Sequence, residues 1–352
     1  MSSLKLNETP VRTSRNFNIN NIKLENIDLP NKIKKFQNVT INKDSQKDLI
    51  YDITDDFEIK YGLGIEKYIK DNSNSRIKLN VNTKTTKDII IEYKFDENNT
   101  NLLENIEIVL DENTKSNIII KYDSDKETKA FHAGIIKVFA KPNSISNIII
   151  VNLLNQTSNN FLSIDNELEE NADIKYTIID FGGQNSITNY YSNLIGDNSN
   201  NIINGIYLGT NKQLFDLNYI TELRGKKTNV NIEVQGALKD EAKKHFKGTI
   251  DFKRGAKKAK GNENENCMLL SSSARSIALP MLLCSEEDVE GNHSTSSGKA
   301  GQKELFYIMS RGFSEKDALK LLVRAKFNSI LEGIKNIETK NRLIYEIENR
   351  LD

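Results

Sequence analysis

Short β-branched segments recur through the middle of this chain at a nearly constant interval. Each begins with a small or polar pair and continues as an apolar run; they start at Ser116-Asn117-Ile118, Ser146-Asn147-Ile148, Ala172-Asp173-Ile174, Ser199-Asn200-Asn201-Ile202 and Thr228-Asn229-Val230. The steps between their polar positions are 30 residues (117 to 147), 26 (147 to 173), 27 (173 to 200) and 29 (200 to 229). Repetition at about 20 to 50 residues indicates a solenoid, in which each coil buries its apolar face only against the next coil.

The residues between these segments restrict the type of solenoid. Asn, Asp, Gly and Ser separate the apolar runs, and no helical period lies between them, which excludes leucine-rich and helical repeats. A β-helix or a large β-sandwich remains. Asparagine at the corners and stacked Ile and Val positions favour a mainly β protein built as a parallel β-helix. We predict this β-helix over residues 88–301, after an irregular or helical N-terminal region at residues 1–87.

Beyond Gly301 the apolar period changes to that of an α-helix. The apolar face of the first predicted helix is formed by Leu305, Phe306, Ile308 and Met309. This helix ends at Gly312, a residue type that suits the left-handed position after a helix. Ser314 then has the position of an N-cap, with Asp317 three residues later. We therefore predict a small helical domain at residues 302–352.

Charge and cysteine content exclude several classes of protein. Lys and Arg together number 49, and so do Asp and Glu, whereas nucleic-acid and membrane-surface proteins normally carry a basic excess. No run of about 18 apolar residues is present to span a bilayer, and the first twenty residues lack the apolar stretch of an export signal. Two cysteines are fewer than a secreted disulfide scaffold would use, so we expect a protein of the reducing cytoplasm.

His293 is the first candidate for chemistry. An imidazole binds metals or carries protons near neutral pH, and this one follows an acidic stretch formed by Glu286, Glu287, Asp288 and Glu290. Glu290 is a weaker candidate in the same stretch. The alternative is a surface histidine in a solvated acidic turn, and spacing alone favours that alternative.

The two cysteines are the remaining candidates. Cys267 lies just ahead of an apolar run and could supply the soft thiolate ligand that iron-sulfur chemistry requires, or it could be a buried structural cysteine. Cys284 follows an apolar strand and is ranked lower, as a core residue. The sequence has no CxxC pair and no set of four cysteines, so this chain alone is not expected to hold a closed cluster or a structural zinc site.

Two motifs in the last quarter of the chain resemble the SufB/SufD family of iron-sulfur cluster assembly proteins. They are the DVxxxH motif from Asp288 to His293 and the LFYxxSRG motif from Leu305 to Gly312. The segment around Cys267 also resembles the family's QCDxLLIG, where SufB-type subunits carry a cluster-associated cysteine. Ser294 follows His293 where SufB-type sequences have glutamate, and no cysteine occurs between residues 130 and 260. The resemblance is therefore to the SufD-like subunit.

The resemblance implies a right-handed parallel β-helix and a non-catalytic assembly subunit. Such a subunit pairs with a SufB-type paralogue, and its histidine in the DVxxxH motif faces that partner where the cluster is thought to be built. The cluster would be transient and shared with the partner, with no cofactor held tightly by the isolated chain. A SufC-type ABC ATPase would dock on the C-terminal helices, with docking candidates at Leu305, Phe306, Tyr307 and Arg311. The sequence leaves open a homodimer of the isolated chain.

A rival hypothesis is a β-helix enzyme acting on polysaccharides. That class is usually exported and uses aromatic platforms for sugars, but this chain has no tryptophan and no export signal. The basic stretch at residues 243–260 could bind a polyanion, although a solvated face of turns is the simpler interpretation and few aromatic residues are interleaved for base stacking. GxxxxGK[ST] is absent, so ATP hydrolysis would have to come from a partner.

Overall fold

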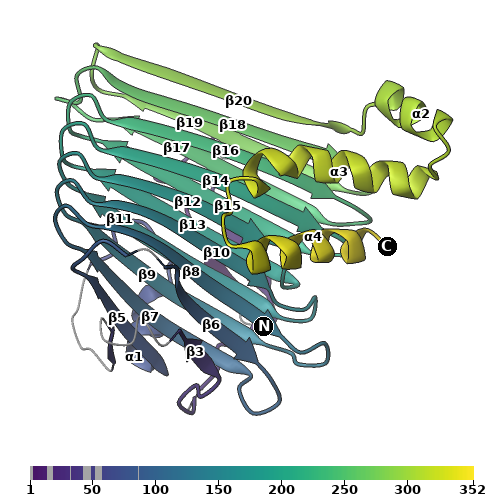
Figure 1. Ribbon diagram of the computed structural model, residues 1–352, viewed down its shortest axis with the longest axis horizontal. Coiled ribbons are helices and arrows are strands. Elements are labelled where there is room, and N and C mark those ends of the chain that lie inside the picture. The colour runs from purple at the N-terminus through teal and green to yellow at the C-terminus, as the bar shows by residue number, and fades with distance from the viewer. Residues whose placement is uncertain (1–2, 14–18, 32, 43–48, 52–57, 86) are drawn as a thin grey trace.

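Two nine-stranded sheets face each other across one interior (Figure 1). The computed structural model describes residues 3–13, 19–31, 33–42, 49–51 (backbone), 58–85 and 87–352. The first sheet consists of β3 (Val39–Ile41), β6 (Ile89–Phe95), β8 (Lys115–Ser124), β10 (Ile145–Leu153), β12 (Asp173–Asp180), β14 (Asn200–Gly209), β16 (Asn229–Leu238), β18 (Ala259–Leu269) and β20 (Val289–Lys299). The second sheet consists of β4 (Leu49–Tyr51), β5 (Ser75–Val81), β7 (Asn101–Leu110), β9 (Phe131–Ala140), β11 (Asn159–Leu168), β13 (Asn185–Leu194), β15 (Leu214–Leu223), β17 (Lys243–Phe252) and β19 (Arg275–Cys284).

From β5 onward the chain alternates between the two sheets, and from β7 onward each strand pairs in parallel with the strand two before it. Ile148 pairs with Ile118 one coil earlier, as the repeat predicts. The predicted parallel β-helix is confirmed. The sequence repeat placed Asp173 in the position equivalent to Asn147, but one coil later. In the structure Asn147 pairs with Lys175 and not with Asp173. The difference is two residues, which keeps every side chain on the same face of the sheet.

Asparagines form the corners between the second sheet and the first, as expected. Asn113, Asn143, Asn171 and Asn198 occupy successive turns with φ between 56° and 61°. Asparagine tolerates this left-handed conformation better than most residues, which explains its recurrence. Lys227 and Lys258 take the same place in the next two such turns.

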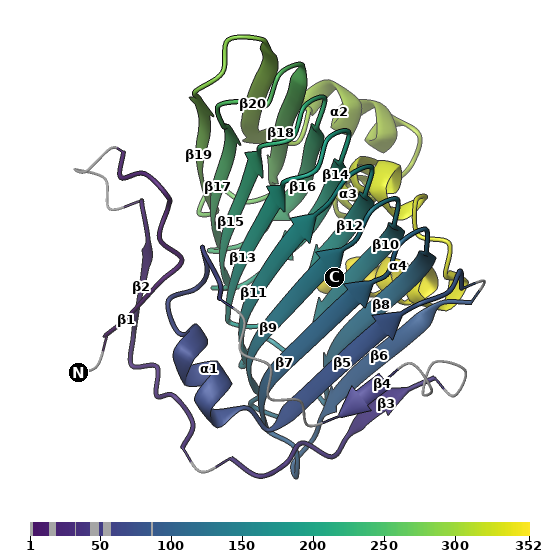
Figure 2. The ribbon, with the colours of Figure 1, turned by 90° about the vertical axis from the view of Figure 1, so that its left-hand side faces the viewer.

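Strands in the middle of the solenoid, such as β9, β11 and β13, bury both of their faces. Inward side chains such as Ile118, Ile148 and Tyr176 form one continuous core along the solenoid. The outer face of the first sheet is covered by α3 (Glu315–Leu331) and α4 (Ile337–Leu351), with Phe327 stacked on Phe181 at a centroid distance of 6.4 Å. The outer face of the second sheet is covered by α1 (Glu66–Asn72) and by the hairpin of β1 (Ser3–Leu6) and β2 (Ile22–Glu25), on the opposite side of the molecule (Figure 2).

The C-terminal helices follow the predicted capping residues. Helix α2 (Gln302–Ser310) is followed by Gly312 at φ 97°, and Ser314 caps α3 by accepting a 3.1 Å hydrogen bond from the Asp317 N–H. No helix in the described part of the chain is long and apolar enough to cross a membrane. The division into domains at 87/88 and 301/302 stays a prediction, and β5 already pairs in parallel with β7 before residue 88.

Candidate functional site at the open end of the solenoid

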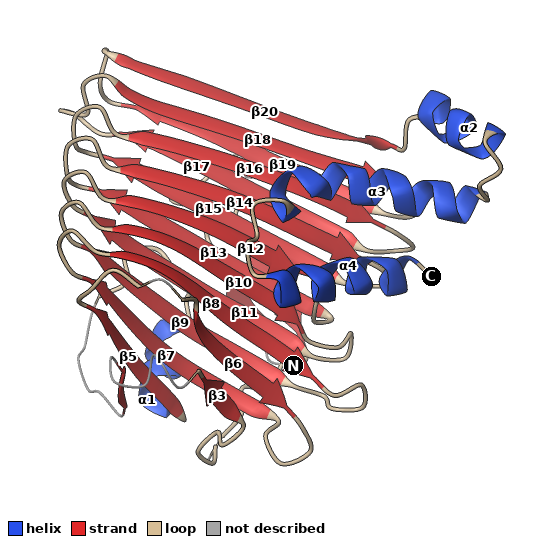
Figure 3. Cartoon of the chain, in the orientation of Figure 1, coloured by secondary structure: helices blue, strands red, loops and turns tan. Residues whose placement is uncertain are grey.

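The last coil of the solenoid is formed by β19 and β20, and within the described ranges no further strand pairs with either (Figure 3). Ten of the eleven residues of β20 are exposed, and the remaining one, Val289, is half-buried. This open end of the solenoid contains His293, the first sequence candidate. His293 lies in the middle of β20, so the expectation of a turn histidine is wrong. The ladder with β18 begins at Val289, directly after the acidic turn, and holds the polar segment extended.

Register determines which way His293 faces. Along β18 the residues Glu263, Glu265 and Cys267 are buried, whereas the intervening asparagines are half-buried on the other face. His293 pairs with Glu263 and Ser297 with Cys267. Paired residues of a parallel ladder project to the same side. His293 is therefore on the interior side, directly over Glu263, and Cys267 lies four residues further along, roughly 13 Å away.

The two weaker candidates are not brought to His293. Glu290 is on the outward face of β20, because it lies three positions before His293 and side chains alternate along a strand. It forms an ion pair with Lys260 at 3.0 Å. Cys284 is exposed at the end of β19, so its assignment to the core is wrong. It borders a hollow of about 690 Å³ formed with Phe252 and Leu282 among others, and its thiol lies 2.9 Å from the Glu286 carbonyl oxygen.

A charged cluster fills the interior beneath the last coil. Lys244, on β17, contacts the Glu265 carboxylate at 2.8 Å, and both side chains are fully buried. The Tyr207 hydroxyl donates a 2.7 Å hydrogen bond to the same carboxylate. Burial raises the pKa of the Cys267 thiol, and the Lys244 charge opposes that effect. Cys267 is thus a buried thiol in a polar setting, not an exposed nucleophile.

Glu263 is the unusual member of this region. It is 1% exposed, and neither carboxylate oxygen has a hydrogen-bond partner among the described residues. The carboxylate crosses the interior to Gly248 on β17, where a Cβ would come within 2.3 Å of it. Burial, with a further contribution from Glu265, raises the pKa of Glu263 to about 8. A buried carboxylate without a partner is costly to keep ionised, so it requires a proton or a cation.

Sequence reasoning missed Lys244, Glu263 and Glu265. The alternation in NENENC, with Glu263, Glu265 and Cys267 at every second position, is the signal that could have placed them on one face of a strand. Nothing in the sequence indicates that this polar face points inward. In the described residues no group of three or more His, Cys, Asp or Glu side chains is placed to hold a metal ion.

The ATPase-docking candidates lie beside the open end, because α2 starts three residues after β20 ends (Figure 1). Phe306 is 75% exposed and Tyr307 58% exposed, while Leu305 is half-buried. The Arg311 guanidinium lies over the Tyr307 ring at 5.2 Å and donates to its hydroxyl at 3.2 Å. These four residues form an exposed aromatic and cationic helix surface.

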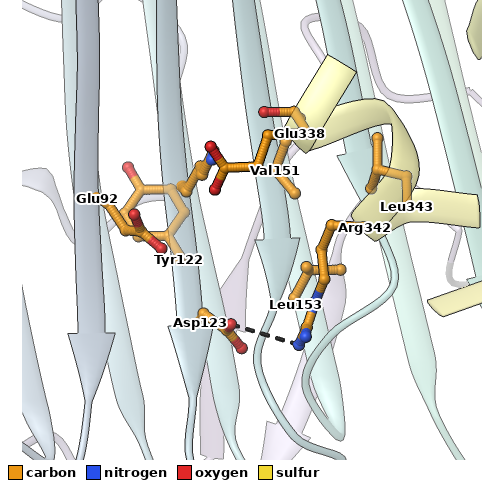
Figure 4. Close-up of a pocket in the computed structure, with 10 residues that line it drawn as sticks. Glu92, Tyr122, Asp123, Val151, Leu153, Glu338, Arg342 and Leu343 are labelled. Carbon is orange, nitrogen blue, oxygen red and sulfur yellow. Dashed lines mark hydrogen bonds and ion pairs between the residues drawn. The ribbon is translucent and has the colours of Figure 1, made fainter. Parts of the chain in front are cut away.

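A pocket of about 250 Å³ lies between α4 and the first sheet and contains none of the predicted site residues (Figure 4). Arg342 reaches across it to the Asp123 carboxylate at 3.5 Å and also pairs with Glu346 at 3.0 Å. Burial raises the pKa of Asp123, and Arg342 opposes this. The pocket is part of the contact that holds α4 on the sheet.

Comparison with known proteins agrees with the family resemblance seen in the sequence. Residues 93–326 match the family model of the SUF system FeS cluster assembly SufBD core domain. The chain is 29% identical over 168 residues to the iron-sulfur cluster assembly protein SufD of Bacillus subtilis, covering 47% of this chain and 38% of that protein. It is 32% identical over 167 residues to a SufBD family protein of Pyrococcus horikoshii (47% and 36%) and 23% identical over 242 residues to Escherichia coli SufD (69% and 57%). The matches thus span less than two thirds of the length of these relatives, but the family model covers most of this chain. The chain belongs to the SufB/SufD family of iron-sulfur cluster assembly proteins and is SufD-like.

Proposed function

We propose that this chain is a cytoplasmic, non-enzymatic scaffold subunit for iron-sulfur cluster assembly. It pairs through the open end of its solenoid with a SufB-type paralogue and presents α2 to a SufC-type ABC ATPase. The observation that carries this proposal is the uncapped edge strand β20, with His293 at its centre on the interior side. Family membership supports the assembly role.

Edge geometry supports pairing through β20. An edge strand presents backbone N–H and C=O groups to a further strand, and proteins normally protect such an edge unless it is used.

The charges are also arranged for antiparallel pairing. The acidic turn from Glu286 to Asp288 precedes β20, and Lys299 and Lys303 lie at its other end. A similarly charged strand laid antiparallel would bring opposite charges together, which suits a paralogue and also a second copy of this chain.

The cluster would be cargo, built between the subunits and then passed on. His293 would supply one imidazole ligand or carry a proton at the joint, and the partner would supply thiolates. Cys284 is an exposed thiol at the same end and stays a weaker candidate. Cys267 lies deeper and away from His293, so it would need a rearrangement to reach a shared cluster. We expect no cluster to remain tightly bound to the isolated chain.

Helix α2 has the composition expected of a docking surface. Exposed aromatic residues together with arginine are the types that dominate binding energy at protein interfaces. Deleting residues 302–352 is a poor test, because α3 and α4 cover the apolar outer face of the first sheet. A point change, Tyr307→Ala, removes the exposed ring that Arg311 covers and leaves this packing intact.

Helix α4 offers a matched control for that change. Tyr345 is 54% exposed, and the Arg342 guanidinium lies 5.8 Å from its ring centre, so Tyr345→Ala removes a comparable pair elsewhere on the helices. In a pull-down with the ATPase, Tyr307→Ala should lose binding and Tyr345→Ala should keep it. Equal retention by both variants would reject α2 as the docking site.

Co-purification tests the proposal as a whole. The chain is co-expressed with the SufB-type paralogue and the ATPase of its own genome, and the tagged chain is isolated under anaerobic conditions. A stable complex that contains both partners is expected. Recovery of the chain alone, or only as a homodimer while the other two proteins associate with each other, would contradict the assigned role.

A further inference from the structure

The turns that lead from the second sheet to the first become basic in two successive coils. They join β15 to β16 and β17 to β18, and the Lys227 N–H of the first donates a 2.8 Å hydrogen bond to the Lys257 carbonyl oxygen of the second. These turns lie where the strands of the first sheet begin. Helix α2 follows the far end of β20, about 35 Å away (Figure 1). The basic corner consists of six exposed cationic residues on the two turns, Arg224, Lys226, Lys227, Arg254, Lys257 and Lys258.

Most charges of the basic corner are not neutralised within the chain. Arg224 contacts the buried Glu222 carboxylate at 2.6 Å. No described carboxylate lies within ion-pair distance of the other five members. By contrast Lys244 and Lys247, from the same basic stretch of the sequence, are buried and each contacts a carboxylate. The fold thus concentrates exposed positive charge at this corner.

Two members of the basic corner occupy a backbone position that does not suit lysine. Lys227 has φ 55° and Lys258 has φ 61°, both in the left-handed region. Four preceding turns of the same series have asparagine there, which tolerates this conformation better than lysine does. In the described chain, lysine takes a left-handed conformation only in the two turns that carry the other cations. A strained residue that no structural contact explains points to a function.

Carboxylates limit the basic corner along the solenoid. Asp197 is exposed on the turn before it, and the acidic turn at residues 286–288 follows it. The Glu286 carboxylate accepts a 2.9 Å hydrogen bond from the Gly255 N–H, so the acidic turn packs directly against the basic corner. Adjacent strands are about 4.8 Å apart, so the unopposed charge spans only two coils. A nucleic acid or an anionic membrane extends further and would bring phosphates against these carboxylates.

We propose that the basic corner binds an acidic segment of a partner protein, a stretch of about four to six residues rich in glutamate and aspartate. Such a segment is about 13 to 20 Å long when extended, which matches the reach of two turns with long side chains. Each exposed ion pair contributes little, so several must form together and binding is weak and sensitive to salt. The basic corner is separate from α2 and from β20, so this inference goes beyond the proposed function and does not depend on it.

The test uses the full isolated chain and a fluorescein-labelled hexaglutamate peptide, followed by fluorescence anisotropy at about 50 mM salt. The wild type should bind the peptide saturably with a Kd below about 1 mM, and about 200 mM salt should remove most of the binding. Lys227→Asn/Lys258→Asn should weaken binding by about tenfold. Lys126→Gln/Lys129→Gln removes two exposed cations from the turn between β8 and β9, and this control should bind as the wild type does.

A second pair of changes separates charge from backbone conformation. Lys227→Gln/Lys258→Gln removes the same two charges but introduces a residue type that does not favour the left-handed conformation. Both double variants should lose binding equally. The asparagine variant should have a higher melting temperature than the glutamine variant, and one no lower than that of the wild type.

Several results would overturn the proposal. They are the absence of saturable peptide binding to the wild type, wild-type affinity in Lys227→Asn/Lys258→Asn, and a melting temperature of that variant below the wild-type value, which would show that the lysines serve the fold. An oligothymidylate of matched charge and phosphatidylglycerol vesicles are tested in parallel. Tighter binding of either one than of the peptide, lost in the same variant, would assign the basic corner to a nucleic acid or to a membrane instead.

Discussion

Replacing Lys244 with methionine removes the ammonium group that neutralises Glu265 beneath the open end, while the side chain keeps nearly its length. The two charges are 2.8 Å apart, and both side chains have no solvent exposure. After the change Glu265 keeps the hydrogen bond from Tyr207 but has no counter-charge, and Glu263 on the same strand face already has none. Glu265 would then be an uncompensated buried charge beside a second carboxyl group, Glu263, whose pKa is already raised to about 8.

The size of the effect follows from burial. Removing one partner of a buried ion pair typically costs about 3 to 5 kcal/mol, because the remaining charge cannot return to water. Adding Glu265→Gln to Lys244→Met removes that charge as well. The free energy of unfolding lost by the double variant should therefore be about 2 kcal/mol smaller than the sum of the losses of the two single variants. The exposed pair of Lys260 and Glu290 has a similar distance of 3.0 Å but side-chain exposures of 59% and 69%. Lys260→Met should cost less than about 1 kcal/mol.

Urea unfolding followed by far-ultraviolet circular dichroism measures these differences. The wild type, the single variants and the double variant are compared by their midpoints and by the slope of the transition, since a solenoid can unfold in segments and a changed slope would reveal it. If Lys244→Met lies within about 1 kcal/mol of the wild type, or if the two changes are additive, the pair is not buried as described and the reasoning is refuted.

Two further predictions concern the outer and inner faces of the first sheet. Phe327→Ala should cost about 3 to 5 kcal/mol in unfolding experiments, because Phe327 is fully buried against Phe181; a cost below about 1 kcal/mol would mean that α3 is not docked there. Burial raises the pKa of Asp180 from 3.8 to about 7 against the hydrogen bonds from Ser186 and Asn152. Its folded pKa exceeds its unfolded value, so stability is lost as pH rises from about 4 to 7, by up to about 4 kcal/mol. The melting temperature of Asp180→Asn should therefore exceed that of the wild type by more at pH 8 than at pH 5. An equal difference at the two pH values would contradict this.

The repeat could be predicted from the sequence because each coil must bury its strand against the next, which constrains spacing strongly. Ile118 and Ile148 stack for that reason. The helical part was equally predictable, since Gly312 and Ser314 act through local backbone geometry. The repeat step to Asp173 was mispredicted because the sequence shows only where an apolar segment begins. The register is set by pairing along the whole ladder.

Features that depend on distant segments could not be predicted. Strands such as β9 are buried on both faces because α1 and the N-terminal hairpin cover one sheet and α3 and α4 the other. His293 was expected in a turn because a run of acidic residues precedes it; its extended conformation comes from the ladder with β18. Glu263 and Glu265 alternate with asparagine and resemble a solvated strand, and only the closed coil shows that they point inward.

The central claim is that the cluster is built at a subunit interface on the open end, to which this chain contributes His293. The direct measurement is cluster content per complex after anaerobic co-expression with the SufB-type paralogue and the ATPase, for the wild type and for His293→Ala. Melting temperature is recorded on the same samples, and the exposed position of His293 limits the expected stability loss to about 1 kcal/mol. We expect an intact complex with a clearly reduced cluster content and a nearly unchanged melting temperature. Normal cluster content in His293→Ala would contradict the claim.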